Sequence, residues 1–298
     1  MHIRTPLLPS TPLTALYGAP VWLKMESSQP AGSFKQRGMG RAAVRAIEAG
    51  ATRLVSSSGG NAGLAVVWVG GRLGVPVTVV VPEQTSASMR ALILAEGAEV
   101  QVHGRAWDDA HARAQELAEE GGALMHPFDH PHIWEGHATL VEELETEPAA
   151  VVVSVGGGGL LAGILRGLQA RAWRPAVYAV ETFGTDSLFR ALEAGRPVKR
   201  DSVEGVALTL GARQVAEEAR RLATEWGVRP IRVRDRQAVD ACERFLEDHR
   251  VLVEPACGAA LSTVYEGLLP LHEDLLVVVC GGAAASPRNL AAWSAAAD

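Results

Sequence analysis

Short valine-rich runs without polar alternation most constrain the fold of this chain. Val77–Val81 and Val151-Val-Val-Ser-Val155 are apolar almost throughout. A strand with one face in water alternates between apolar and polar residues, whereas a continuously apolar strand is typical of a parallel sheet covered on both faces. Parallel strands need crossover connections, and helical stretches follow most of these runs. The alternation therefore predicts an α/β fold with right-handed crossovers.

The expected strands and helices follow from apolar runs, glycines and prolines along the chain. We predict strands at Val21–Glu26, Leu54–Ser57, Val77–Val81, Glu99–His103, Val151–Val155, Val177–Glu181, Pro230–Val233 and Leu275–Cys280. We predict helices at Lys35–Ala49, Asn61–Leu73, Ser86–Glu96, Ala106–Glu119, Trp134–Glu145, Leu160–Ala172, Ala212–Trp226, Gln237–His249, Ala259–Leu269 and Pro287–Ala295.

The region Leu54–Phe128 is a β/α series of its own, between the glycine- and proline-containing stretches Ser27–Gly32 and Pro127–Pro131. This arrangement predicts a smaller domain inserted into a larger one. We place the small domain at 31–131 and the large domain at 1–30 and 132–298.

Charge and composition exclude several classes of function. The formal net charge of −6 argues against a nucleic-acid footprint. No apolar run approaches the roughly 18 residues of a membrane helix, and the first ten residues lack the apolar stretch of a signal peptide. Three widely spaced cysteines do not form a disulfide framework. We expect a cytoplasmic protein without nucleic-acid or membrane partners.

The strongest local signal is Gly156-Gly-Gly-Gly159, which ends an apolar strand directly before a helix. Glycines let several backbone N–H groups converge on one anion, and the helix N-terminus adds a partial positive charge. The pattern therefore favours a phosphate site. It is neither a Walker A loop nor a dinucleotide fingerprint. The simpler interpretation is a tight turn between strand and helix.

A second glycine-containing turn, Ser57-Ser58-Gly59-Gly60-Asn61-Ala62-Gly63, also joins a strand to a helix. Its N–H groups and hydroxyls suit a carboxylate or a phosphate. Ser58 or Asn61 alone would serve as a helix cap, and the additional polar groups favour a binding loop.

Lysine occurs only at Lys24, Lys35 and Lys199. Lys35 lies where a loop enters a helix, and the helix dipole with partial burial would depress the pKa of its amine, as a nucleophilic lysine requires. A solvent-exposed lysine is the alternative. Lys24 is expected to pair with Glu26 on one strand face, and Lys199 to lie in a solvated loop.

Two further features leave alternatives open. Histidines crowd near Asp129, but their spacing matches no common zinc pattern and suits a polar prolyl turn better. They are His126, His130, His132 and His137. Cys280 ends the last expected strand, where ligands lie in open α/β sheets, and it is a candidate either for the site or for the core.

Several segments together resemble the fold-type II, tryptophan-synthase-β-like family of pyridoxal-phosphate enzymes, and within it the L-serine dehydratases. The resemblance runs over nearly the whole chain. It is carried by Ser33-Phe34-Lys35, Ser57–Gly63, Pro127-Phe128-Asp129, Ile133–His137, Gly156–Leu160, Glu181–Gly184, Val253–Gly258 and Cys280-Gly281-Gly282. It implies two open, mainly parallel twisted sheets flanked by helices, with a smaller domain inserted in a larger one.

The resemblance also implies roles for individual residues. Lys35 would hold pyridoxal phosphate covalently and act as the catalytic base, with Phe34 against the cofactor ring, Asn61 on its 3′ oxygen and Cys280 at its pyridine nitrogen. Backbone N–H groups would bind the cofactor phosphate at Gly156, Gly157, Gly158, Gly159 and Leu160. The substrate carboxylate would lie on Ser58, Gly59, Asn61 and Ala62. A monovalent cation such as potassium would lie among Glu181, Thr185, Ser187, Leu210 and Ala212.

The implied activity is β-elimination of L-serine to pyruvate and ammonia, and of L-threonine to 2-oxobutanoate, in a homodimer. One methyl group discriminates by only about 1–3 kcal/mol in an apolar pocket, so both activities can coexist. A threonine ammonia-lyase, a serine racemase and a cysteine-synthase-like enzyme of β-replacement use the same first steps and remain alternatives. A non-catalytic amino-acid or nucleotide binder would leave Lys35 unexplained.

Overall fold

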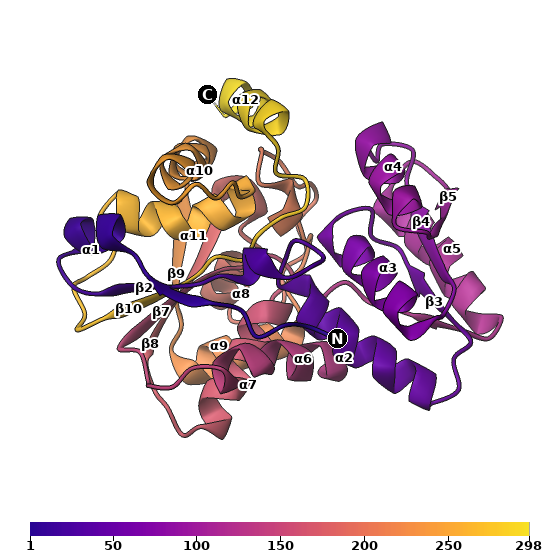
Figure 1. The fold of residues 1–298 in the computed structure, drawn as a ribbon, viewed down its shortest axis with the longest axis horizontal. Coiled ribbons are helices and arrows are strands. Elements are labelled where there is room, and N and C mark those ends of the chain that lie inside the picture. Colours follow the sequence, from indigo (N-terminus) through magenta and orange to yellow (C-terminus); the bar gives the residue numbers. More distant parts are fainter. Residues whose placement is uncertain (298) are drawn as a thin grey trace.

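The computed structural model describes residues 1–297, which form two sheets surrounded by helices (Figure 1). The strands are β1 (Leu7–Pro9), β2 (Val21–Lys24), β3 (Arg53–Ser56), β4 (Val77–Val81), β5 (Glu99–Val102), β6 (Gly122–Leu124), β7 (Ala150–Ser154), β8 (Ala176–Thr182), β9 (Arg229–Val233) and β10 (Leu275–Val278). The helices are α1 (Thr11–Tyr17), α2 (Lys35–Glu48), α3 (Asn61–Leu73), α4 (Ala87–Ala95), α5 (Trp107–Glu119), α6 (Pro131–Glu142), α7 (Gly159–Ala170), α8 (Ser187–Ala194), α9 (Glu217–Trp226), α10 (Asp235–His249), α11 (Pro255–Tyr265) and α12 (Pro287–Ala296).

The larger sheet has six strands in the order β1-β2-β10-β7-β8-β9. Only β1 is antiparallel, to β2, and the other pairs are parallel, with Val152 opposite both Val277 and Tyr178. In Figure 1, α10 and α11 lie on one face of this sheet and α6, α7 and α9 on the other. All five residues of β7 are buried, as its continuous apolar run predicts.

The smaller sheet has four parallel strands in the order β5-β4-β3-β6, all formed between Arg53 and Leu124. Figure 1 shows it beside the larger sheet, with α2 between the two. The predicted class of fold, an α/β protein with two mainly parallel sheets, is confirmed.

The expected strands all occur, and their ends shift by at most two residues. Two strands were not expected: β1 is a three-residue, exposed edge strand that contains a proline, and β6 is Gly-Ala-Leu without a β-branched residue. The short helices α1 and α8 were also not expected. The helix predicted at Ala212–Trp226 is wrong at its first residues, because the observed helix α9 begins only at Glu217. Ala216 N–H instead donates to the carbonyl of Gly157, which holds the preceding residues against the glycine loop.

Lys24 pairs with a carboxylate as expected, but its partner is Glu143 rather than Glu26. Lys24 Nζ lies 2.5 Å from Glu143 Oε2 and 2.8 Å from the carbonyl oxygen of Thr5. Glu26 begins a 3₁₀ turn beyond the end of β2, so the alternation of strand faces does not reach it, and it binds the buried guanidinium of Arg37 at 2.7 Å. These buried ion pairs and hydrogen bonds connect the N-terminal segment to α2 and α6.

Candidate functional site

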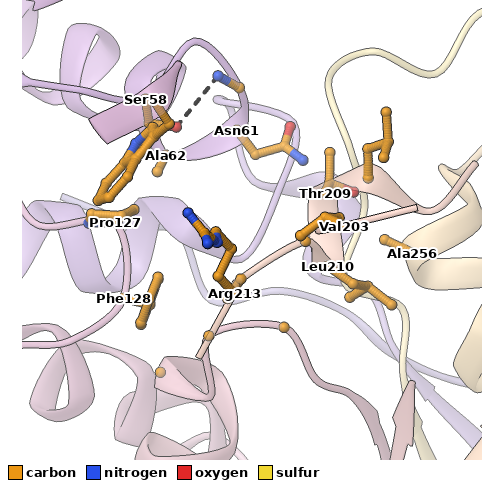
Figure 2. A pocket seen from close by; sticks show the side chains of 18 of the residues that line it. Ser58, Asn61, Ala62, Pro127, Phe128, Val203, Thr209, Leu210, Arg213 and Ala256 are labelled. Atoms are coloured by element: carbon orange, nitrogen blue, oxygen red, sulfur yellow. Dashed lines mark hydrogen bonds between the residues drawn. The ribbon is translucent and has the colours of Figure 1, made fainter. Parts of the chain in front are cut away.

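A cavity of about 800 Å³ lies at the carboxyl ends of strands from both sheets. Segments that follow β3, β6, β7 and β10 all contribute to its wall, together with the start of α2 and the loop before α9. Figure 2 shows Ser58, Asn61 and Ala62 on one side of this space and Thr209, Leu210 and Ala256 on the other. Side chains 150 residues apart in the chain therefore meet in one cavity.

Lys35 is the first residue of α2 and lies in the cavity wall. Its Nζ donates to the carbonyl oxygen of Pro127 at 2.6 Å and lies 5.2 Å from the centre of the Phe34 ring. Burial lowers the pKa of the Lys35 amine to about 8. A substantial neutral fraction therefore exists near pH 7 to 8, which a nucleophilic amine requires.

The glycine loop that follows β7 needs glycine for reasons of space. A Cβ on Gly157 would overlap the ring of Phe128, and one on Gly156 would lie 2.8 Å from the carbonyl oxygen of Leu210. Gly158 has a φ of +88° and precedes the first residue of α7. All four glycines line the cavity, and the first N–H groups of a helix have no partner within it, so this loop suits an anion.

The loop after β3 places polar groups at the start of α3. Gly60 N–H donates to Ser58 Oγ at 3.4 Å (Figure 2), and Ser58, Asn61 and Ala62 line the cavity. The first N–H groups of a helix have no partner within it, so they suit a carboxylate. Gly59 is not among the residues that line the cavity, and a Cβ added to it would lie 2.8 Å from Thr85 Cγ2.

Cys280 lies in the cavity wall at the end of β10 and is buried. Its backbone carbonyl accepts from Phe34 N–H at 3.1 Å, which fixes the position of Phe34 and hence of Lys35. A hydrogen bond with Cys257 and burial raise the pKa of the Cys280 thiol well above its usual value. The group is therefore a neutral thiol at physiological pH.

The five residues that the resemblance assigns to a cation lie partly together. Ser187 Oγ donates to the carbonyl of Gly156 at 3.3 Å, and Leu210 and Ala212 line the cavity beside the glycine loop. The Glu181 carboxylate accepts the N–H groups of Leu188 and Phe189 at 2.8 and 2.7 Å.

Burial raises the pKa of Glu181 to about 8, against the opposing effect of those two N–H groups. Thr185 Oγ1 lies 2.9 Å from Thr182 Oγ1. In residues 1–297 the structure brings no three histidine, cysteine or acidic side chains into a cluster that could hold a metal.

The histidine-rich stretch forms a turn. His126 Nδ1 accepts from Asp129 N–H at 2.7 Å, and burial lowers the pKa of His126 to about 4. His130 caps α6 by accepting from His132 N–H. His137 packs 5.1 Å from the Phe34 ring and is fully buried.

Sequence reasoning missed the exposed rim of the cavity. Arg213 and Asp108 lie there with Trp107, and Thr209, which also lines the cavity, donates to Glu254. Lys199 is exposed as expected and also lines the outer cavity. No local pattern singles out the segment from Lys199 to Gln214, since it has neither helical nor strand periodicity. Only the fold brings it to the site.

The cavity brings together an amine of lowered pKa, a glycine loop at the start of α7 and the polar start of α3. This combination suits an enzyme that uses a phosphorylated carbonyl cofactor. Residues 1–281 match the family described as pyridoxal-phosphate dependent enzyme. The chain belongs to this family.

Individual relatives agree with that assignment. A serine dehydratase-like protein of Mus musculus is 47% identical, with 97% of this chain and 93% of the relative covered. The L-serine dehydratase/L-threonine deaminase of Homo sapiens is 43% identical, with 98% and 94% covered. The crystal structure of a fungal L-serine ammonia-lyase from Rhizomucor miehei matches with a TM-score of 0.94 at 35% identity, covering 100% of this chain and 99% of that one.

The residues present fit pyridoxal phosphate. A Cβ at Gly157 or Gly159 would overlap Phe128, so only glycine lets this loop follow its path along the cavity, and Lys35 supplies an amine of lowered pKa on the same cavity wall. When bound, this cofactor withdraws electrons from the α-carbon of an amino acid. None of the helices formed by residues 1–297 is long and apolar enough to cross a bilayer.

Proposed function

We propose that this enzyme is an L-serine dehydratase, which converts L-serine to pyruvate and ammonia. The observation that carries the proposal is the meeting in one cavity of Lys35, the glycine loop Gly156–Gly159 and the polar start of α3. The high identity to dehydratases over nearly their whole length supports the choice of substrate.

Each group then has a defined task. Lys35 would anchor the cofactor and then, as a neutral amine, accept the proton from the α-carbon of serine. The N–H groups of Gly156 to Leu160 would hold the phosphate, and those at Asn61 and Ala62, with Ser58 Oγ, the substrate carboxylate. The α-proton and the β-hydroxyl of serine would together be lost as one water molecule, and a second water molecule would hydrolyse the resulting imine to pyruvate and ammonia.

The neutral thiol of Cys280 supports elimination over side reactions. A carboxylate at this position would keep a pyridine nitrogen protonated and strengthen electron withdrawal, whereas a thiol of raised pKa would not. Negative charge would then not accumulate at the α-carbon, and prompt loss of the β-hydroxyl would be favoured.

L-threonine is a second proposed substrate. The human relative is named for both serine dehydration and threonine deamination, and one methyl group discriminates between the two amino acids by only about 1–3 kcal/mol in an apolar pocket. Racemisation and β-replacement remain the alternatives that share the first steps.

Reduction with borohydride tests the proposal at Lys35. The purified holoenzyme is reduced and digested, and the labelled peptide is mapped, while oxo-acid release is assayed with serine and with threonine. Label on Lys35 with pyruvate formation supports the proposal. Label on Lys24 or Lys199 would overturn the assignment of the cofactor site, and label on Lys35 without oxo acid from either substrate would favour a racemase or synthase.

We also propose a monovalent cation, preferably potassium, at Glu181, Thr185, Ser187, Leu210 and Ala212. The hydrogen bond from Ser187 to the carbonyl of Gly156 supports this cation site, because an ion bound beside Ser187 would stabilise the glycine loop.

Three further proposals concern the organisation of the chain. We propose that 31–131 is a substrate-side domain and that 1–30 with 132–298 form the cofactor-binding domain.

We propose that the enzyme is a homodimer, for which the exposed Leu7 and Leu8 of edge strand β1 offer apolar surface. We propose a cytoplasmic location. Sedimentation analysis tests the dimer.

A further inference from the structure

A buried carboxylate, Glu254, lies in the wall of the cavity and has no role in the proposal above. It directly precedes α11 and is 1% exposed. A buried carboxylate is costly unless several donors satisfy it, so its hydrogen bonds show what it does.

Three separate segments donate to Glu254. Asn61 Nδ2 and Thr209 Oγ1 approach Oε2 at 3.1 and 2.9 Å. The N–H of Ala284 donates to Oε1 at 2.9 Å. The carboxylate thereby joins the start of α3, the 3₁₀ turn Leu208–Leu210 and the chain that leaves β10.

The Asn61 amide is fixed from both ends. Its Nδ2 donates to Glu254, while its Oδ1 accepts from Ala283 N–H at 2.8 Å. A flipped amide would set Nδ2 against the Ala283 donor and Oδ1 against the Glu254 carboxylate, so both contacts would become repulsive. Because an amide nitrogen carries two hydrogens, one remains for a ligand in the cavity that Asn61 lines.

The position of the carboxylate is itself enforced by packing. Gly282 has a φ of +150°, and a Cβ there would overlap Glu254 Cδ. The backbone after β10 therefore passes directly against this carboxylate, and glycine is required for that approach.

We propose that Glu254 is a positioning residue that orients the Asn61 amide, so that its free hydrogen is donated to an oxygen of the bound cofactor. The inference rests on the proposed binding of pyridoxal phosphate in this cavity. It adds a group that acts on the cofactor only through Asn61.

A double-mutant cycle on pyridoxal phosphate binding tests this coupling. The dissociation constant and the wavelength of the visible band are measured for the wild type, Glu254→Gln, Asn61→Ala and the double variant, each reconstituted with pyridoxal phosphate. Glutamine keeps the size of Glu254 but places an NH₂ group against donors. We expect Glu254→Gln to weaken binding about tenfold and to shift the band, and to have less than about a twofold effect in the Asn61→Ala background.

Two outcomes would overturn the inference: unchanged affinity and band in Glu254→Gln, or an equal loss in both backgrounds. Failure of the wild type to bind pyridoxal phosphate would instead overturn the proposed function. If Glu254→Gln does not fold by circular dichroism, Glu254→Asp enters the same cycle, since it withdraws the carboxylate by one methylene. Glu273→Gln is the matched control, because Glu273 is exposed near the amino end of β10, opposite the cavity, and should bind as the wild type does.

Discussion

The guanidinium of Arg213 contacts the carboxylate of Asp108 at 3.3 Å and so joins the loop before α9 to the first turn of α5. Both residues line the cavity. Their exposed fractions are 42% and 60%. An ion pair so open to water adds little to stability, because solvent screens it and both side chains lose entropy.

Removal of this pair should therefore be mild. We expect Asp108→Asn to lower the free energy of unfolding by less than about 1 kcal/mol in urea titrations. Glu143→Gln is the contrasting variant, since Glu143 binds the buried Arg37 and Lys24, and we expect it to cost about 3–5 kcal/mol. Similar losses from both variants would contradict this contrast.

The lowered pKa of Lys35 should control loading of the cofactor. Only the neutral amine attacks a carbonyl, so the rate should rise about tenfold per pH unit below the pKa and level off above about 8. The rate is followed by stopped-flow growth of the visible band after the cofactor has been removed. A rate that continued to climb steeply from pH 9 to 10 would refute a lowered pKa, and Lys35→Ala should give no band from covalent attachment.

The absence of a side chain at Gly157 should be essential for binding of the phosphate. We expect Gly157→Ala to weaken pyridoxal phosphate binding at least about tenfold, because the added Cβ meets the Phe128 ring and must displace the loop. Equilibrium titration of the visible band measures the effect. Gly71→Ala is the control, since a Cβ there meets nothing within 4 Å and alanine favours the interior of α3. It should leave affinity unchanged and stabilise the fold by up to about 1 kcal/mol.

A bound cation should stabilise the folded protein. We expect the melting temperature to be higher in potassium chloride than in the chloride of a large organic cation at equal ionic strength, because a ligand of the native state alone stabilises it. Calorimetric scans provide the measurement. Ser187→Ala, which removes a hydroxyl proposed as a ligand, should reduce the difference. Equal melting temperatures for the wild type in the two salts would argue against the cation site.

The sequence by itself determined the class of fold and the local chemistry. Continuous apolar runs such as Val151–Val155 require cover on both faces, and this requirement alone predicts buried parallel strands. Scarcity of lysine and the position of Lys35 at a helix start singled out one amine. The glycine loop could also be recognised from the sequence, because its spacing and its place after a strand are local properties.

Tertiary structure decided which groups meet and which way they face. Gly59 belongs to the polar loop in the sequence, and only the fold shows that a Cβ there would meet Thr85 and Val81. Lys24 pairs with Glu143, more than a hundred residues away, and Arg213 reaches the cavity rim because Ala216 is bound to Gly157. Glu254 holds Asn61 across 193 residues of chain. Such contacts follow from the packing of segments that are distant in sequence, so the local periodicity of the sequence does not predict them.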